Sequence, residues 1–174
     1  AAATGGTIIS SKYHFDMVRI GIGLYGLWPS LELKIQLDNQ IKLKPVLSWK
    51  TILMETKPVK AGSFIGYDLT EQMPNDGRLG ILPIGYWHGF DRGLSSIGEV
   101  LILGKRTKII GRVSMDMAAV NLTGVPQARI GNEVTLIGKQ DQEEIAAGEI
   151  AKKIGTISYE VLTRINPLIK RIVV

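Results

Sequence analysis

Residues 99–122 have the sequence EVLILGKRTKIIGRVSMDMAAVNL. This stretch contains short apolar runs at 99–103, 108–110 and 117–122, and the turn-forming Leu103-Gly104-Lys105 separates the first two runs. Short strands that alternate with turns at this spacing are typical of an all-β barrel or sandwich. The stretch therefore predicts a mainly β, barrel-like domain.

The same pattern of short apolar runs continues on both sides of this stretch. Turn signals such as Pro74-Asn75-Asp76-Gly77 lie between the runs and punctuate the chain. The additional strands that we expect lie at residues 46–55, 64–67, 78–83, 133–137 and 170–174.

One or two helices are expected near the carboxy terminus. Asp141 followed by Glu144 forms a capping-box pattern, which predicts that a helix begins at this point. The apolar residues that recur at helical spacing and would face a core are Ala147, Ile150, Ala151 and Ile154. A second short helix is expected over residues 158–163.

The first part of the chain has a different character. Met17-Val18-Arg19-Ile20 is short and apolar apart from the arginine, as a buried parallel strand would be. The glycines at 21, 23 and 26 suit a turn at which the backbone meets a ligand. We therefore expect residues 1–34 to be the end of an α/β domain and residues 35–174 to form a mostly β domain.

The composition is that of a globular protein. The chain has 174 residues, of which 45% are hydrophobic and 21% are charged, and its net charge is +5. Its basic residues are spread along the chain without interleaved aromatic residues, so no nucleic-acid partner is indicated. No apolar run approaches the ~20 residues of a membrane span, and no signal-peptide pattern is present.

Cysteine is absent, and the only histidines are His14 and His88. These counts exclude a disulfide scaffold, a thiolate or histidine-rich metal site, and a cysteine nucleophile. The lack of disulfides fits a reducing, cytoplasmic location. We therefore expect neither a metal nor a membrane contact for this segment.

Two amino-terminal features could contact an anionic ligand. In Thr4-Gly5-Gly6-Thr7 the small residues would let N–H groups and hydroxyls approach an anion, and a flexible terminus is the alternative. Arg19 lies among apolar neighbours on a strand that we expect to be buried, and a buried guanidinium needs a partner. That partner is either Asp16, in a structural ion pair, or an atom of a ligand.

Three later segments could carry chemistry. Tyr67 follows a glycine and could transfer protons if a nearby cation stabilises its anion, and a packed barrel tyrosine is the alternative. The loop of residues 83–95 is rich in glycine, aromatic and charged residues, as functional loops and plain β-turns both are. In residues 111–117 a backbone N–H could hold a carboxylate, whereas Arg112 and Asp116 could simply pair with each other.

Five segments resemble motifs of the bacterial alanine racemases, which are pyridoxal-phosphate enzymes. Each motif alone is weak, but all five occur in the family's order over nearly the whole chain. The segments are MVRIGIGLYG at 17–26, IGY at 65–67, PIGYWHG at 83–89, GRVSMD at 111–116 and VTLIG at 134–138. The chain thus resembles the carboxy-terminal part of these enzymes.

This resemblance implies a fold and an activity. Residues 1–34 would be the carboxy-terminal end of an incomplete (β/α)8 barrel that binds pyridoxal 5'-phosphate, and residues 35–174 the β domain of the family. The full-length protein would interconvert L- and D-alanine by a two-base mechanism and supply D-alanine for peptidoglycan. No segment matches the motif of the barrel lysine that binds the cofactor covalently, so we expect the chain alone to be inactive.

The resemblance also implies which residues contact the cofactor. Thr4 would hold the cofactor phosphate, together with the backbone N–H groups of Gly21 and Ile22. Arg19 would face the pyridine nitrogen.

The residues implied for the substrate lie further along the chain. Tyr67 would be the second catalytic base, and the N–H of Met115 would bind the substrate carboxylate. The residues that would line the opening through which the substrate enters are Tyr86, Arg92, Arg112 and Asp116.

The family's active sites form between two subunits, so the resemblance implies a homodimer. Tyr67 and Met115 would serve the partner's cofactor. The chain departs from the family at Trp87-His88, where Ala-Asp is usual, and at Asp68, where glycine is common. The alternatives that stay open are a serine racemase of the vancomycin-resistance type and a non-catalytic dimerisation domain.

Overall fold

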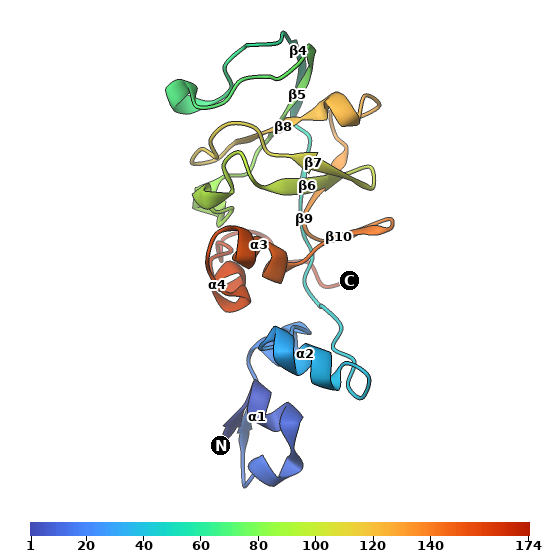
Figure 1. Cartoon of the computed structure of the whole chain (residues 1–174), viewed down its shortest axis with the longest axis vertical. Coiled ribbons are helices and arrows are strands. Elements are labelled where there is room, and N and C mark those ends of the chain that lie inside the picture. The colour runs from blue at the N-terminus through green and yellow to red at the C-terminus, as the bar shows by residue number, and fades with distance from the viewer. The chain divides into compact units, whose positions relative to one another are not determined.

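The computed structural model describes all 174 residues, which separate into two compact units, Ala1–Leu47 and Ser48–Val174 (Figure 1). We call them the amino-terminal and the carboxy-terminal unit. The amino-terminal unit extends to Leu47 because the segment after its last helix folds back on it, where the Val46 N–H donates to the Tyr25 carbonyl at 3.2 Å.

The amino-terminal unit consists of short elements around a two-stranded parallel sheet. Strand β1 pairs with β2 through Ala2↔Val18 and Ala3↔Arg19, and helix α1 lies between them in the sequence. The elements are β1 (Ala2–Ala3), α1 (Thr4–Ile9), η1 (Ser11–Tyr13), β2 (Val18–Arg19), η2 (Ile22–Tyr25) and α2 (Leu31–Leu37), where η denotes a 3-10 helix.

The expected strand at residues 17–20 forms in part but is not buried. Met17 is 59% exposed and Arg19 is also exposed. Strand β2 pairs only with β1, and a two-stranded sheet leaves its side chains uncovered. The prediction of a buried strand is therefore wrong for the unit as it stands.

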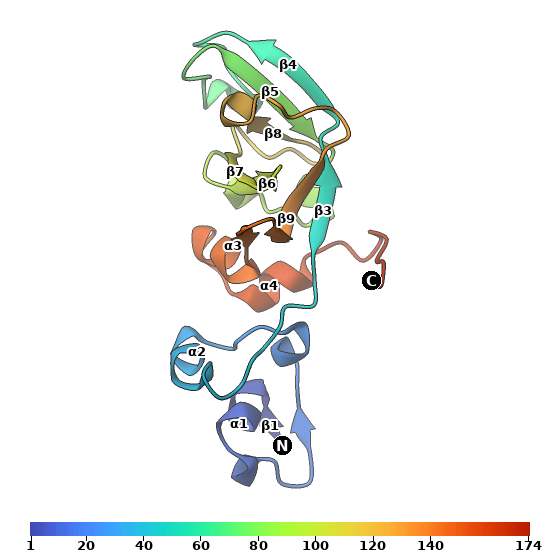
Figure 2. The ribbon, with the colours of Figure 1, turned by 90° about the vertical axis from the view of Figure 1, so that its right-hand side faces the viewer.

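The carboxy-terminal unit is mainly β, as predicted. Its larger sheet has the strand order β10-β9-β6-β7 with β3 on β9, and its smaller sheet has the order β4-β5-β8. All pairings in both sheets are antiparallel, and Figure 2 shows β3 running beside β9. The sheets meet at a single bridge between Ile109 and Val120 and do not close into a barrel. The strands are β3 (Trp49–Ile52), β4 (Glu55–Val59), β5 (Gly77–Leu82), β6 (Glu99–Ile102), β7 (Lys105–Lys108), β8 (Ala118–Asn121), β9 (Glu133–Gln140) and β10 (Glu143–Ile145).

Helices cover one end of the carboxy-terminal unit, and short 3-10 helices lie in its loops. None of the helices is long and apolar enough to cross a membrane. The elements are η3 (Tyr67–Leu69), η4 (Tyr86–His88), η5 (Arg92–Leu94), η6 (Leu122–Gly124), α3 (Ala147–Lys153) and α4 (Ser158–Thr163).

The core of the carboxy-terminal unit lies between its sheets and beneath its helices. Leu82, Leu101 and Leu136 are fully buried, and the rings of Trp49 and Phe90 meet edge to face with centroids 6.2 Å apart. A second cluster packs under the loop that carries Tyr67. It consists of Ile65, Met73, Leu79 and Ile110.

Several expected elements differ from the structure. Residues 46–55 are two strands, because the Leu53 N–H bonds to Asn132 near the large sheet while the next N–H, of Met54, bonds to Ile81 of the small sheet. Residues 64–67 contribute only a bridge between Phe64 and Gln72. The strand expected at 108–110 lies earlier, at 105–108.

The two terminal predictions also need correction. Asp141 does not begin a helix but occupies the hairpin turn before β10, with φ 54°, and α3 begins at Ala147. Residues 170–174 form no strand, since no other strand pairs with them and Val173 is 99% exposed. The strands expected near 78–83, 99–103, 117–122 and 133–137 and the helix at 158–163 are confirmed.

Candidate functional site

Tyr67 lies at the tip of the long connection between β4 and β5. We call residues 66–70 the Tyr67 tip. Its backbone is unusual, because Gly66, Asp68 and Leu69 have positive φ values of 78°, 64° and 50°. The side chain of Tyr67 is 68% exposed, so it is available to a ligand or to another protein surface.

The base of this tip is held by hydrogen bonds. The Ile65 N–H donates to the backbone oxygen of Glu71 at 2.9 Å. The Glu71 carboxylate accepts the Gly111 N–H at 2.7 Å and the Lys108 ammonium at 2.9 Å. Partial burial, the largest influence, raises the pKa of Glu71, but the hydrogen bonds that it accepts and the charge of Lys108 together lower it below its ordinary value.

The segment after β7 packs directly against this base. Gly111 has φ 73°, and a Cβ atom there would lie 2.4 Å from the Ile65 carbonyl oxygen, so only glycine fits. Arg112 Nε lies 2.8 Å from Asp68 Oδ2. The alternative in which Arg112 pairs with Asp116 is therefore wrong, because Asp68 on the Tyr67 tip is its partner.

The loop of residues 83–90 is paired with the loop that carries Met115. The Tyr86 N–H donates to the Ser114 oxygen at 3.0 Å, and the Trp87 N–H donates to the Met115 oxygen at 2.8 Å. A Cβ atom on Gly85 would lie 2.3 Å from the Ser114 oxygen, so the two backbones meet only because residue 85 is glycine. The Met115 N–H has no acceptor within the chain and can bind an external carboxylate.

His88 replaces the acid of the family motif and keeps the turn closed. Its Nδ1 accepts the Gly85 N–H at 3.2 Å, which requires the unprotonated nitrogen on that side. Asn166 holds the same turn from outside, because its N–H and its side-chain amide donate to the oxygens of His88 and Trp87. This loop is therefore anchored at both ends.

Of the four residues expected at the substrate opening, three line two separate hollows. Tyr86 and Arg92 line a depression of about 370 Å³ beside the ion pair of Asp91 with Arg164. Arg112 lines a separate cavity of about 520 Å³ together with Gly66 and Met117. Asp116 is exposed and forms no ion pair.

The cofactor residues expected in the amino-terminal unit form a compact arrangement of their own. The buried Thr4 side chain accepts the N–H of Gly21 at 3.1 Å and that of Gly23 at 3.4 Å. Its hydroxyl hydrogen stays available to a further acceptor. The N–H of Ile22, the first residue of η2, has no acceptor within the chain.

Arg19 has no partner in the chain. Its guanidinium makes no hydrogen bond or ion pair, so the alternative pairing with Asp16 does not form. Arg19 follows Val18 on β2, which pairs in parallel with β1 immediately before Thr4. The guanidinium is therefore free to face a ligand atom.

Sequence reasoning missed Glu71 and the role of His88. Glu71 carries no motif, and only its hydrogen bonds across 40 residues of sequence to Gly111 reveal its position. No group of His, Cys, Asp or Glu side chains lies close enough to hold a metal ion.

Comparisons with known proteins point to one family. Residues 46–173 match the family described as "Alanine racemase, C-terminal domain". An alanine racemase from Leptospira interrogans is 44% identical over 178 aligned positions, which cover 100% of this chain and 46% of that protein. The chain therefore spans about half the length of this relative.

Solved structures agree in fold. A crystal structure of alanine racemase from Bacillus anthracis with bound L-Ala-P matches with a TM-score of 0.89 and 39% identity, over 95% of this chain and 42% of that chain. Alanine racemase from Bartonella henselae with covalently bound pyridoxal phosphate matches with a TM-score of 0.86 and 30% identity, over 98% of this chain and 45% of that chain.

Proposed function

The chain belongs to the alanine racemase family, and we propose that it is the carboxy-terminal part of a pyridoxal-phosphate-dependent enzyme that interconverts L- and D-alanine. One observation carries the proposal. The segments before Tyr67 and Met115, represented by Gly66 and Ser114, border the same cavity in a chain of this family. Tyr67 and Met115 are the two residues that the family's chemistry needs from its β domain.

We propose further that residues 1–34 are the end of a (β/α)8 barrel and residues 35–174 the β domain. The parallel pairing of β1 with β2, with α1 between them in sequence, supports the first part. Parallel neighbours joined through a helix are the repeating unit of such barrels. The family match over residues 46–173 supports the second part.

The donors in the amino-terminal unit fit a phosphate group. The Thr4 hydroxyl and the Ile22 N–H are free to donate, and a Cβ placed on Gly21 would meet no atom within 4 Å, which leaves open space beside them. The Gly21 N–H donates to Thr4, so its contribution is to orient the hydroxyl. Hydroxyl and backbone donors of this kind suit an anion.

Arg19 fits the pyridine nitrogen of the cofactor because its guanidinium has no partner in the chain. When bound, pyridoxal phosphate supplies the electron sink that makes the α-proton of the amino acid removable. A cation beside the nitrogen keeps that nitrogen unprotonated and weakens the sink, which limits side reactions. Replacement Arg19→Glu should therefore increase transamination by-products, and an unchanged yield of by-products would contradict this role.

Tyr67 and Met115 act on the substrate. Tyr67 removes or returns the α-proton on one face of the substrate, and its exposed position on the tip makes it accessible. The free Met115 N–H binds the substrate carboxylate and fixes its orientation. Tyr86, Arg92, Arg112 and Asp116 lie near the opening through which the substrate enters, where Tyr86 and Arg92 line one hollow and Arg112 lines the other.

We propose a homodimer in which Tyr67 and Met115 serve the site of the partner. The exposure of both side chains, 68% and 57%, supports this assignment, because residues that complete a neighbour's site must protrude from their own subunit. Thr4 and Arg19 would serve the cofactor of their own subunit.

The full-length protein that contains this chain tests the proposal. We expect it to racemise alanine in the presence of pyridoxal phosphate, measured by circular dichroism of the product. Tyr67→Phe should lower kcat by about 100-fold or more, the usual contribution of a general base. Tyr159→Phe, on α4, is the matched control and should keep the rate. An unimpaired Tyr67→Phe variant, or no racemase activity of the full-length protein, would overturn the proposal.

A second measurement tests where the cofactor lysine lies. The 174-residue chain is incubated with pyridoxal phosphate, reduced with borohydride, and its intact mass is measured. We expect scattered partial labelling, as surface lysines give. One stoichiometric adduct would mean that this chain carries the lysine itself.

A further inference from the structure

The Tyr67 tip is a strained segment with few contacts of its own. Asp68 and Leu69 both have left-handed φ values, which are uncommon for residues other than glycine. Tyr67, Asp68 and Leu69 are all exposed, so apolar packing does not hold them in place. Such backbone conformations persist only where the surrounding structure enforces them.

Two carboxylates attach this tip to the segment after β7. Asp68 pairs with Arg112, but the Asp68 side chain is 61% exposed, and exposed ion pairs contribute little. Glu71 is different, because its side chain is only 18% exposed and it accepts both a backbone N–H and an ammonium group. Hydrogen bonds to a charged acceptor are the stronger kind.

The contacts of Glu71 fix the tip relative to its neighbours. The Glu71 backbone oxygen closes the base of the tip through the Ile65 N–H, while its carboxylate binds Gly111, which packs on the Ile65 oxygen. One residue therefore joins both ends of the tip to the segment that continues to Met115.

We propose that Glu71 is a positioning residue for Tyr67: it holds the strained tip so that the phenol lies where a proton is transferred. This inference rests on the proposed role of Tyr67 as a base. In this role Glu71 itself does not contact the substrate. Displacing a reacting group by ~1 Å can cost about 100-fold in rate, so a tip that relaxes after loss of Glu71 should transfer protons slowly.

The test uses three variants of the full-length protein. Glu71→Ala removes both side-chain contacts, and Glu71→Gln keeps a neutral acceptor for the Gly111 N–H but loses the ion pair with Lys108. Asp76→Asn is the matched control, because Asp76 accepts the Lys60 ammonium at 2.7 Å and the Ala61 N–H at 2.9 Å near the other end of the same connection.

The expected results follow an order. Glu71→Ala should lower kcat by about 10- to 100-fold, Glu71→Gln should lower it less, and Asp76→Asn should keep it within about twofold. The α-deuterium isotope effect on kcat/KM should rise for only one enantiomer of alanine, the one whose proton Tyr67 removes. A general loss of structure would not make the two enantiomers differ in this way.

Two outcomes would overturn the inference. One is a Glu71→Ala enzyme that is as active as Asp76→Asn. The other is a slower enzyme whose isotope effects for the two enantiomers stay equal. The proposed function is judged separately by Tyr67→Phe, so an impaired Tyr67→Phe variant beside a normal Glu71→Ala variant would reject the positioning role alone.

Discussion

The two units of the chain differ in how they are stabilised. The carboxy-terminal unit has a core that includes Leu53, Leu82 and Leu101, all fully buried. In the amino-terminal unit Ile22 is the only buried hydrophobic side chain, while Phe15 is 77% and Ile35 is 73% exposed. Burial of apolar surface is the main term that offsets the loss of chain entropy. The carboxy-terminal unit therefore has enough buried apolar surface to fold by itself, and the amino-terminal unit does not.

This difference bears on the proposed site. Tyr67 and Met115 lie on loops attached to a packed unit, whereas Thr4 and Arg19 lie on short elements that have no core beneath them. The residues proposed to bind the cofactor thus need apolar surface from outside their own unit to be held in place, and the residues proposed to act on the substrate do not.

The largest expected effect comes from separating the units. Residues 48–174 expressed alone should unfold cooperatively, since the core lies within them, and residues 1–47 alone should show no cooperative transition. Urea titrations followed by circular dichroism measure both. A cooperative transition in the 1–47 peptide would contradict this difference between the two units.

A pair of single substitutions sharpens the same contrast. Leu101→Ala should lower the free energy of unfolding by about 2–5 kcal/mol, because it opens a cavity in the core. Ile35→Ala removes a similar side chain from an exposed position and should change it by less than about 0.5 kcal/mol. Chemical denaturation of the whole chain gives both values, and equal losses would contradict the division.

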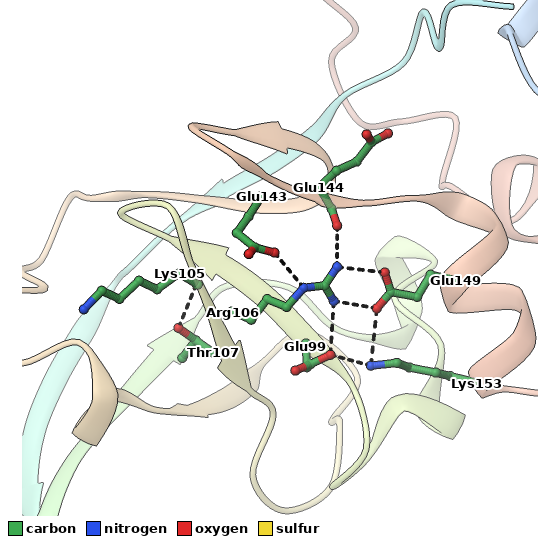
Figure 3. Close-up of polar contacts among 8 residues, drawn as sticks. All are labelled: Glu99, Lys105, Arg106, Thr107, Glu143, Glu144, Glu149 and Lys153. Atoms are coloured by element: carbon green, nitrogen blue, oxygen red, sulfur yellow. Dashed lines mark hydrogen bonds and ion pairs between the residues drawn. The ribbon is translucent and has the colours of Figure 1, made fainter.

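The next largest effect on stability is expected from a polar network, which also lies in the carboxy-terminal unit. Figure 3 shows Arg106 of β7 surrounded by Glu99, Glu143 and Glu149. The Glu149 carboxylate accepts hydrogen bonds from two guanidinium nitrogens of Arg106, at 2.7 and 3.0 Å. Lys153 adds a second cation. The cluster joins the strands β6 and β7 to the β9–β10 hairpin and to α3.

Loss of this arginine should leave three carboxylates without their shared partner. Arg106 is 33% exposed, between a surface and a buried group, so Arg106→Ala should cost about 1–2 kcal/mol of unfolding free energy. Arg106→Lys keeps the charge but not the fork and should recover only part of it. The exposed pair of Lys60 with Asp76 is the control, and Lys60→Ala should cost less than about 0.5 kcal/mol. A loss no larger than that of the control would show that the network does not stabilise the unit.

Sequence patterns predicted the local part of this architecture and missed what distant contacts decide. The alternating runs located most strands, and the helical spacing of Ala147, Ile150 and Ala151 placed them on a buried face. The capping-box pattern at Asp141 failed because Glu143 and Glu144 pair with β9, and the guanidinium of Arg106 binds the Glu144 oxygen. No local sequence signal indicates that Glu144 contacts Arg106, which lies 38 residues away.

The same limit applies to the site. The motifs around Tyr67 and Met115 contain glycines such as Gly85 and Gly111, and the structure places both where two backbones approach closely. They did not predict that Arg112 pairs with Asp68 on the Tyr67 tip, or that Glu71 holds the base of that tip. Those contacts depend on how two loops meet in the fold.

The smallest expected effect is the response of the Arg106 network to acid. Hydrogen bonds from Arg106, the largest cause, and its charge together with that of Lys153 lower the pKa of Glu149 below its ordinary value of 4.5. The folded protein therefore binds this proton less readily than the unfolded chain. The contribution of the Glu149 carboxylate to stability is complete above pH 4.5 and is lost as the pH falls through the lower, folded pKa.

Glu149→Gln should flatten the decline of unfolding free energy below pH 4.5 relative to the parent, while Asp141→Asn, in the exposed turn outside the network, should leave that decline unchanged. Parallel acid profiles for the parent and Glu149→Gln would mean that the network does not couple protonation to the folding of this unit.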